Sequence, residues 1–336
     1  MKESLRITVM MDEGCVPADD PEFTSDDQTP ITERHVVTAL RELGHQVRIL
    51  PVGHELAPVM ASLREPPDLV FNLTEQFGND RRMDKNLAGL LELMQVRYTG
   101  TGPTGMMLCR DKGLSKQILS LHRIRGPDFF VVPVGRTPKP PRRIQYPLIV
   151  KPVYEDASEG ISMASVVKNA DELAQRVRLV HERYQQIAIA EEYISGRELY
   201  LAILGNRRLS AFPAREIRFG ADGNGGPEIA TSRVKWDKNY REKWKIEYCF
   251  ADLPQPLAAK VAHVCKKVYR LLQLRDFGRI DLRVTDDNRI VILEVNPNPD
   301  IAYGEEVAEA AGAVGISYNQ LIDRIVRLAL RRYESA

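Results

Sequence analysis

The sequence predicts an α/β protein that begins with a doubly wound parallel sheet and continues into lobes of mixed helix and sheet. Apolar strands alternate with amphipathic helices over residues 1–103, the pattern of a parallel sheet with helices on its faces. An antiparallel hairpin is predicted much later, within residues 278–299. The chain has 336 residues, which is enough for two or three structural units with large cores.

Four strands are expected in the N-terminal domain, at residues 5–11, 46–50, 68–73 and 96–99. The first helix begins at Thr29-Pro30, because proline suits the first helical position, and ends at Gly44. A second helix ends near Leu63, and a third spans the leucines around residues 87–94. The acidic residues between positions 12 and 27 are interpreted as a solvated loop rather than a metal site.

Composition points to a soluble globular protein without a nucleic-acid partner. Apolar residues make up 43% of the chain and charged residues 28%, and the formal net charge is +1. The basic segment 134–143 lacks aromatic residues that could stack on bases, so it is interpreted as a solvated connector. The four cysteines are far apart and form no CxxC pair, which favours reduced thiols over structural zinc. With no leader pattern and no apolar run near ~18 residues, we expect a cytoplasmic protein with no membrane partner.

The middle of the chain is predicted to contain further short elements. Helices are expected over residues 104–121, 170–186 and 257–272, the second of them capped by Asn169 with Glu172 three residues on. Strands are expected over 129–133, 147–151, 161–167, 187–194 and 199–204. Lys151 ends an apolar strand, and a lysine is seldom buried without a partner, so it either reaches solvent or meets an anion. The loop 156–160 is by itself only a weak signal for phosphate binding. Glu75 follows the third strand, where parallel sheets bind ligands, and is either a substrate contact or a surface residue.

The hairpin of residues 278–299 carries the strongest chemical signal. If Asp287-Asn288 is a two-residue loop, Asp281 faces Glu294 across the ribbon. Arg279 then faces Asn296, and the two-residue side-chain period places both pairs on one face.

Two opposed carboxylates would repel each other by roughly 4 kcal/mol at ~4 Å with an effective dielectric near 20. The compensation is either a counter-charge from Arg279 or Arg283, exposure of both acids to water, or a divalent cation. Two carboxylates and an amide oxygen are ligands that Mg²⁺ accepts together with phosphate oxygens. These alternatives stay open on geometry alone.

The order of motifs resembles the ATP-grasp superfamily, and within it the D-alanine–D-alanine ligase-like branch. Residues 90–116 resemble the segment leading to the first nucleotide-binding lysine, Lys112, and PLIVKP resembles the strand that carries the second, Lys151. AEEYISGREL resembles the inter-lobe segment that binds adenine, and GRIDLRV with ILEVNPNP resembles the metal hairpin. The resemblance covers residues 68–325 and implies an N-terminal domain over 1–103 and two ATP-binding lobes over 104–192 and 193–336.

The resemblance also implies the cofactors and the roles of individual residues. It implies ATP with Mg²⁺ or Mn²⁺, an acylphosphate formed from a carboxylate substrate, its displacement by an amine substrate, and a possible homodimer. Arg279 would stabilise the transferring phosphoryl group, and Lys235, or alternatively Lys238, would reach the γ-phosphate. The implied ATP contacts are Lys112, Lys151, Ser158, Gly160, Glu191, Glu192, Tyr193, Ile194 and Glu198, and the implied metal ligands are Asp281, Glu294 and Asn296.

Departures from the family pattern fall where substrates bind. The glycine-rich N-terminal motif is missing, Thr74-Glu75 replaces a His-Gly pair, and Asp300 replaces a glycine. Glu75 and Asp300 therefore suggest a substrate bearing an amine or guanidine. The leading prediction is an ATP-dependent carboxylate–amine ligase that forms a peptide or amide bond. The alternatives are D-alanine–D-alanine ligase itself and a nucleotide-binding regulatory protein without turnover.

Overall fold

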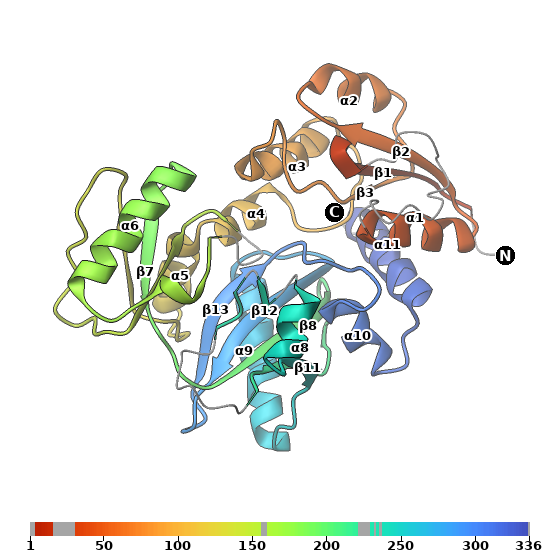
Figure 1. Cartoon of the computed structure of the whole chain (residues 1–336). Helices are drawn as coiled ribbons and strands as arrows, with labels where there is room; N and C mark the ends of the chain where they lie inside the picture. The colour runs from red at the N-terminus through yellow and green to blue at the C-terminus, as the bar shows by residue number, and fades with distance from the viewer. Residues whose placement is uncertain are drawn as a thin grey trace.

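The computed structural model describes residues 4–15, 31–155, 160–220, 229–231, 233–234 and 237–334. These described residues form three sheets, one in each of three lobes (Figure 1). The N-terminal lobe, in red and orange, and the central lobe, in green, lie on either side of the blue C-terminal sheet.

The N-terminal sheet is parallel, as predicted, and its strand order is β2-β1-β3. Its strands are β1 (Arg6–Asp12), β2 (Gln46–Val52) and β3 (Leu69–Asn72), and its helices are α1 (Ile31–Glu42), α2 (Leu56–Ser62) and α3 (Asp84–Leu93). The predicted fourth strand at residues 96–99 is wrong, because that segment makes only an isolated bridge between Tyr98 and Val70. Most of the acidic stretch between β1 and α1 lies outside the described residues.

The predicted helix over residues 104–121 is two helices, α4 (Pro103–Arg110) and α5 (Lys112–Leu121). Asp111 between them has extended backbone angles, and its carboxylate accepts a hydrogen bond from the Leu114 amide at 2.9 Å. An N-cap residue has non-helical backbone angles, so an aspartate that caps a new helix also ends the helix before it. The break places Lys112 in the first turn of α5.

The central sheet is antiparallel, with order β4-β7-β5-β6. Its elements are β4 (Phe129–Val132), β5 (Leu148–Pro152), β6 (Val166–Val167), β7 (Ala188–Glu192) and α6 (Ala170–Tyr184). The side chain of Asn169 caps α6 as predicted, by accepting from the Glu172 amide. The strand predicted over residues 161–167 is largely wrong. A capping box at Ser162 and Ser165 starts a 3-10 helix there, and only the two residues of β6 pair.

The C-terminal sheet has six strands, with β11-β10-β8-β12-β13 in order and β9 paired to β8. The strands are β8 (Arg197–Gly205), β9 (Leu209–Ala211), β10 (Arg215–Arg218), β11 (Glu247–Phe250), β12 (Phe277–Val284) and β13 (Ile290–Asn296). The helices are α8 (Lys238–Lys243), α9 (Gln255–Leu271), α10 (Glu306–Gly312) and α11 (Tyr318–Glu334). Helix α9 buries Val261, Cys265 and Val268 in one core with the apolar residues of β8 and β12. Helix α11 returns to pack beside α1 (Figure 1).

The β12–β13 hairpin has the predicted pairing at its functional end and a different turn. Asp281 lies opposite Glu294, and Arg279 lies opposite Asn296. The loop has three residues, 286–288, because Thr285 pairs with Arg289 and Asn288 takes a positive φ of 59°. A bulge at Leu293 then shifts the register by one, since Leu282 faces Ile292. The predicted turn was one residue too short and the bulge was not predicted, and these two errors offset each other in the register, so the predicted pairs at Asp281 and Arg279 are correct.

Candidate active site

Four side chains of the hairpin lie together on one face of the C-terminal sheet. The guanidinium of Arg279 donates to both carboxylate oxygens of Asp281, at 2.8 and 3.1 Å. The Asn296 amide also donates to Asp281, at 3.1 Å. Glu294 is paired instead with Lys112, whose Nζ lies 3.0 Å from its carboxylate. Arg279 and Lys112 therefore compensate the two opposed acids in this structure.

Arg279 is the most constrained cation of the site. A second carboxylate, Glu306 at the start of α10, accepts from it at 3.0 Å, and its guanidinium lies over the Tyr200 ring at 5.4 Å. Burial disfavours the charged form, but Asp281 and Glu306 outweigh burial and raise the pKa of Arg279 well above its usual value. The side chain is thus a fixed positive charge beside the acids.

A cluster of buried charges connects the central lobe to the hairpin. Glu191 on β7 lies 3.0 Å from the Lys151 ammonium and 3.4 Å from that of Lys116. Lys116 also donates to the carbonyl of Leu293, the bulged residue of β13, at 2.5 Å. Lys151, predicted either to reach solvent or to meet an anion, is buried and meets a carboxylate.

The sequence interpretation missed Lys116. It follows Lys112 by one helical turn on α5, so the i, i+4 spacing could have placed both lysines on one helix face. Burial lowers the pKa of Lys116 to about 8, although Glu191 acts in the opposite direction. For Glu191, burial raises the pKa and the two lysines lower it, and the net shift is downward.

A small cavity of about 80 Å³ lies between the central and C-terminal sheets. Glu198, predicted to bind ribose, lines it and is held by Arg283 at 2.7 Å and by the Tyr200 hydroxyl at 2.9 Å. The other predicted residues that line this cavity are Lys151, Glu191, Glu192, Tyr193, Ile194, Asp281 and Glu294. The structure thus brings the predicted adenine segment and the acids of the hairpin to one cavity.

Of the remaining residues predicted to contact the nucleotide, some are described by the structure and others lie outside the described residues. Lys112 is buried and reaches both Glu294 and the Glu155 carbonyl, at the start of the predicted phosphate loop. Gly160, at the end of that loop, has a positive φ of 74°. Ser158 and Lys235 lie outside the described residues, as does the side chain of Lys238.

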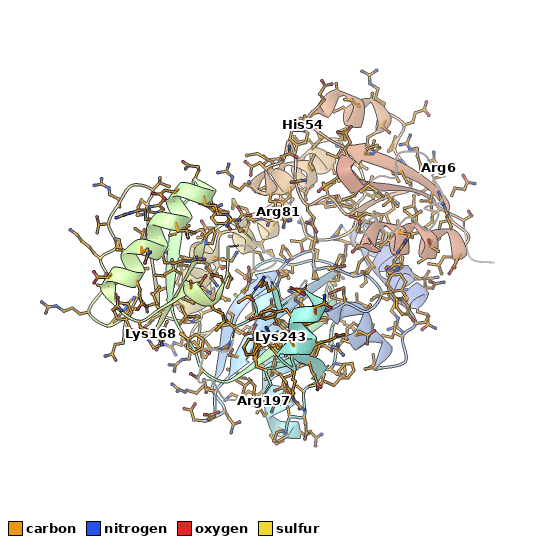
Figure 2. All side chains as sticks on the ribbon, viewed as in Figure 1. Arg6, His54, Arg81, Lys168, Arg197 and Lys243 are labelled. Carbon is orange, nitrogen blue, oxygen red and sulfur yellow. The ribbon has the colours of Figure 1, made fainter. Side chains whose placement is uncertain are left out.

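A larger cavity of about 390 Å³ lies between the N-terminal domain and the C-terminal lobe. Arg279 and Asn296 line it together with Glu75 and Asp300, the two predicted substrate contacts. Its other charged residues were not predicted, and they are Arg81, Asp84, Arg110, Arg215, Arg241, Glu305 and Glu306. Arg81 lies on the side of the N-terminal lobe that faces the rest of the molecule (Figure 2).

Acids near this cavity have raised pKa values. Burial, then the neighbouring Glu306 and Asp300, raises the pKa of Glu305 to about 7. Burial, then Glu75 and Asp300, raises that of Glu33 to about 7 as well. This end of the cavity therefore favours a cation over further negative charge.

A hairpin that presents acids to a cavity between two antiparallel sheets, beside buried lysines, defines an ATP-grasp protein, the predicted fold. A D-alanine–D-alanine ligase from Bacillus anthracis, solved in complex with ATP, superposes with a TM-score of 0.76 at 21% identity, over 99% of this chain and 100% of that one.

Residues 137–327 match the family described as D-ala D-ala ligase C-terminus. The protein y4sG of Sinorhizobium fredii is 31% identical over 89% of this chain and 87% of its own. The D-alanine–D-alanine ligase of Bordetella petrii is 33% identical over 75% of this chain and 74% of its own length. The chain belongs to the D-alanine–D-alanine ligase family, which confirms the predicted class of ATP-dependent carboxylate–amine ligases.

Two features are absent from the described residues. These residues contain no helix long and apolar enough to cross a membrane. They also contain no group of three or more His, Cys, Asp or Glu side chains that could hold a metal ion. The predicted metal set differs from such a group, because it consists of two carboxylates and the amide of Asn296.

Proposed function

We propose that this protein is an ATP- and Mg²⁺-dependent ligase that joins a carboxylate substrate to an amine substrate. An oxygen of the carboxylate attacks the γ-phosphorus of ATP, and ADP leaves. The amine nitrogen then attacks the acyl carbon, the C–N bond forms, phosphate leaves and the nitrogen loses a proton. Phosphoryl transfer of this kind requires positioning and charge neutralisation more than a covalent nucleophile.

One observation supports this proposal above the others: a single hairpin lines both cavities. Asp281 and Glu294 line the small cavity, and Arg279 and Asn296 line the large one. A nucleotide in the first would therefore present its terminal phosphate toward a substrate in the second. Arg279, buried and permanently charged, would stabilise the transferring phosphoryl group and then the tetrahedral oxyanion.

The donor set fits Mg²⁺. Asp281, Glu294 and Asn296 offer hard oxygen atoms, and the hairpin pairing places the two carboxylates opposite each other. Mg²⁺ bound there would neutralise phosphate charge. Lys112, now paired with Glu294, and Lys151, now paired with Glu191, are cations that could move to the polyphosphate.

D-alanine–D-alanine ligase activity is the second candidate, favoured by the names of relatives such as the Bordetella petrii protein. The presence of Asp300 favours an acceptor substrate other than D-alanine. Asp300 lines the substrate cavity, and its carboxylate accepts from Thr32 and from the Ala302 amide at one oxygen, Oδ1. An acceptor carrying an amine or guanidine fits this acidic wall. Restoration of D-alanine use by Asp300→Gly would identify Asp300 as the cause of the difference, and an unchanged acceptor preference would exclude it.

Phosphate release from ATP tests the proposal. The purified protein is given ATP, Mg²⁺ and pairs of L- and D-amino acids, and products are identified by mass. We expect phosphate release that requires both substrates and yields their condensation product. ATP binding without phosphate release for any pair would instead indicate a nucleotide-binding regulatory protein. Condensation of D-alanine with itself as the preferred reaction would support the second candidate.

A further inference from the structure

Helix α9 carries a stripe of basic side chains on its outer face. Its exposed basic residues are Lys260, His263, Lys267 and Arg270, and Lys266 beside them is half-buried. Their spacing of three and four residues places the four exposed side chains on one face of the helix. At ~1.5 Å per residue, the stripe extends for about 15 Å along the helix axis.

The turn after α5 continues this stripe. The Lys267 ammonium donates to the His122 carbonyl at 3.1 Å, which holds the turn beside α9. His122 and Arg123 are exposed there, and the neighbouring Leu121 is 83% exposed. We call the two segments together the basic surface, which consists of Leu121, His122, Arg123, Lys260, His263, Lys266, Lys267 and Arg270.

Acidic residues are excluded from both segments of the basic surface. Residues 112–127 and 253–275 contain no aspartate or glutamate, although the chain has 46 acids among its 336 residues. Among the residues that the structure describes, none of the lysines and arginines of the basic surface has an ion-pair partner. Like charges three or four residues apart on a helix repel each other, and α9 has no acid to compensate. The basic surface is therefore a concentration of positive charge in a chain whose net charge is only +1.

The basic surface lies on the opposite side of the C-terminal sheet from the candidate active site. Ile280 and Leu282 of β12 pack into the core that α9 covers. Arg279 and Asp281 of the same strand line the two cavities. Because successive side chains of a strand point to opposite faces, a partner bound on α9 leaves both cavities accessible.

The composition of the basic surface favours a lipid bilayer over nucleic acid as its partner. Residues 112–127 and 253–275 contain one aromatic residue, Tyr269, and its side chain is buried, so it cannot stack on a base. After its first residue, α9 has no Asn, Gln, Ser or Thr side chain to bind base edges. An exposed leucine among cations instead suits the interface of an anionic bilayer, where cations meet phosphate groups and an apolar side chain enters the acyl boundary.

We propose that the basic surface binds an anionic lipid bilayer, with Leu121 inserted between the headgroups and both cavities open to solvent. Such peripheral binding requires no membrane-spanning helix, and the described residues contain none. It differs from the sequence prediction of no membrane partner, which considered leaders and spanning segments but not the distribution of surface charge. It is independent of the proposed ligase chemistry, because it uses no residue of either cavity.

Co-sedimentation with lipid vesicles tests the proposal in the absence of ATP and substrates. The vesicles contain phosphatidylcholine alone, or equal parts of phosphatidylcholine and phosphatidylglycerol. We expect binding only to the anionic vesicles at ~0.1 M salt, and its loss at ~1 M, where the Debye length falls from about 10 Å to about 3 Å. Each cation near an anionic surface corresponds to about a 5-fold gain in affinity, so Lys260→Glu/Lys267→Glu should bind at least about 30-fold more weakly. The control Lys168→Glu/Lys243→Glu has the same charge change at exposed positions elsewhere (Figure 2) and should bind like wild type.

Tryptophan emission tests the orientation on the bilayer. Leu121→Trp is compared with Leu93→Trp, because Leu93 on α3 is 85% exposed and lies in another lobe. We expect emission to move to shorter wavelength only for Leu121→Trp, and only with anionic vesicles. This comparison leaves the basic residues intact, so it decides the case even if a charge-reversed variant does not fold.

Several outcomes overturn the proposal: no sedimentation of wild type with anionic vesicles, equal losses in the two double variants, or equal emission changes at the two tryptophans. Tighter binding to a DNA duplex or an RNA strand than to the vesicles also overturns it and assigns the basic surface to nucleic acid. Neither measurement depends on turnover, so the result is separate from success or failure of the ligase proposal.

Discussion

Lys116 offers the sharpest test of how the central lobe supports the hairpin. Its ammonium donates to the Leu293 carbonyl at 2.5 Å and lies 3.4 Å from Glu191. Leu293 is the bulged residue that brings Glu294 into register with Asp281. Because a one-residue slip would turn Glu294 to the other face of the sheet, the contact bears directly on the site.

The expected cost of Lys116→Met follows from these contacts. The Leu293 carbonyl loses its charged donor, which costs ~1–3 kcal/mol for a buried group. Breaking a buried pair costs ~3–5 kcal/mol, but Glu191 keeps Lys151 at 3.0 Å, so only part of that loss applies. We expect a destabilisation of about 2–4 kcal/mol in total. Lys168→Met, at an exposed position on the central lobe (Figure 2), should stay within ~0.5 kcal/mol of wild type.

Urea unfolding of four proteins measures this coupling: wild type, Lys116→Met, Glu191→Gln and the double variant. Because one ammonium contacts one carboxylate, the double variant should lose less stability than the sum of the single losses, by about 1 kcal/mol or more. Strict additivity, or a Lys116→Met loss no larger than that of Lys168→Met, would refute the reasoning.

Three further predictions concern metal, folding and pH. Glu294→Ala should abolish Mg²⁺-dependent turnover and the additional rise in melting temperature that Mg²⁺ gives with ATP, while the protein still folds; a fully active variant would exclude the hairpin as the metal site. Arg332→Met should destabilise the protein by ~3–5 kcal/mol in urea unfolding, because it leaves Asp276, which is fully buried and 3.1 Å from Arg332, without its cation. The pKa of Glu33 is raised from 4.5 to about 7, so the folded state binds more protons between these values and wild-type stability should fall as pH rises through them. Glu33→Gln should flatten this part of the pH profile, and an unchanged slope would contradict the assignment.

Local patterns predicted the parts of the fold that depend on local physics. The Asn169 cap of α6 and the alternation in β12 and β13 correspond to observed elements. The prediction failed at residues 96–99 because an apolar segment can cross the edge of a sheet with a single bridge. It also failed at Asp111, where the carboxylate caps a new helix although the sequence on both sides has helical character.

The same division holds within the candidate site. The hairpin face could be predicted, because the two-residue side-chain period is a local property and the two register errors offset each other. The partners of that face could not, since they come from other lobes. Lys112 reaches Glu294 from α5, and Glu306 reaches Arg279 from the segment after the hairpin. No spacing rule connects α5 to β13, which lie more than half the chain apart.

These partners change the physical account of the opposed acids. Mg²⁺ does not have to be present for Asp281 and Glu294 to coexist, because Arg279 and Lys112 already hold one acid each. The two cations are not equivalent. Arg279 is bound by two carboxylates and keeps a partner if Asp281 turns to a metal, whereas Lys112 would be released from Glu294. In the proposed function, a Mg²⁺ ion held by Glu294 would leave the Lys112 ammonium available for a phosphate oxygen of the nucleotide, whereas Arg279 would keep Glu306.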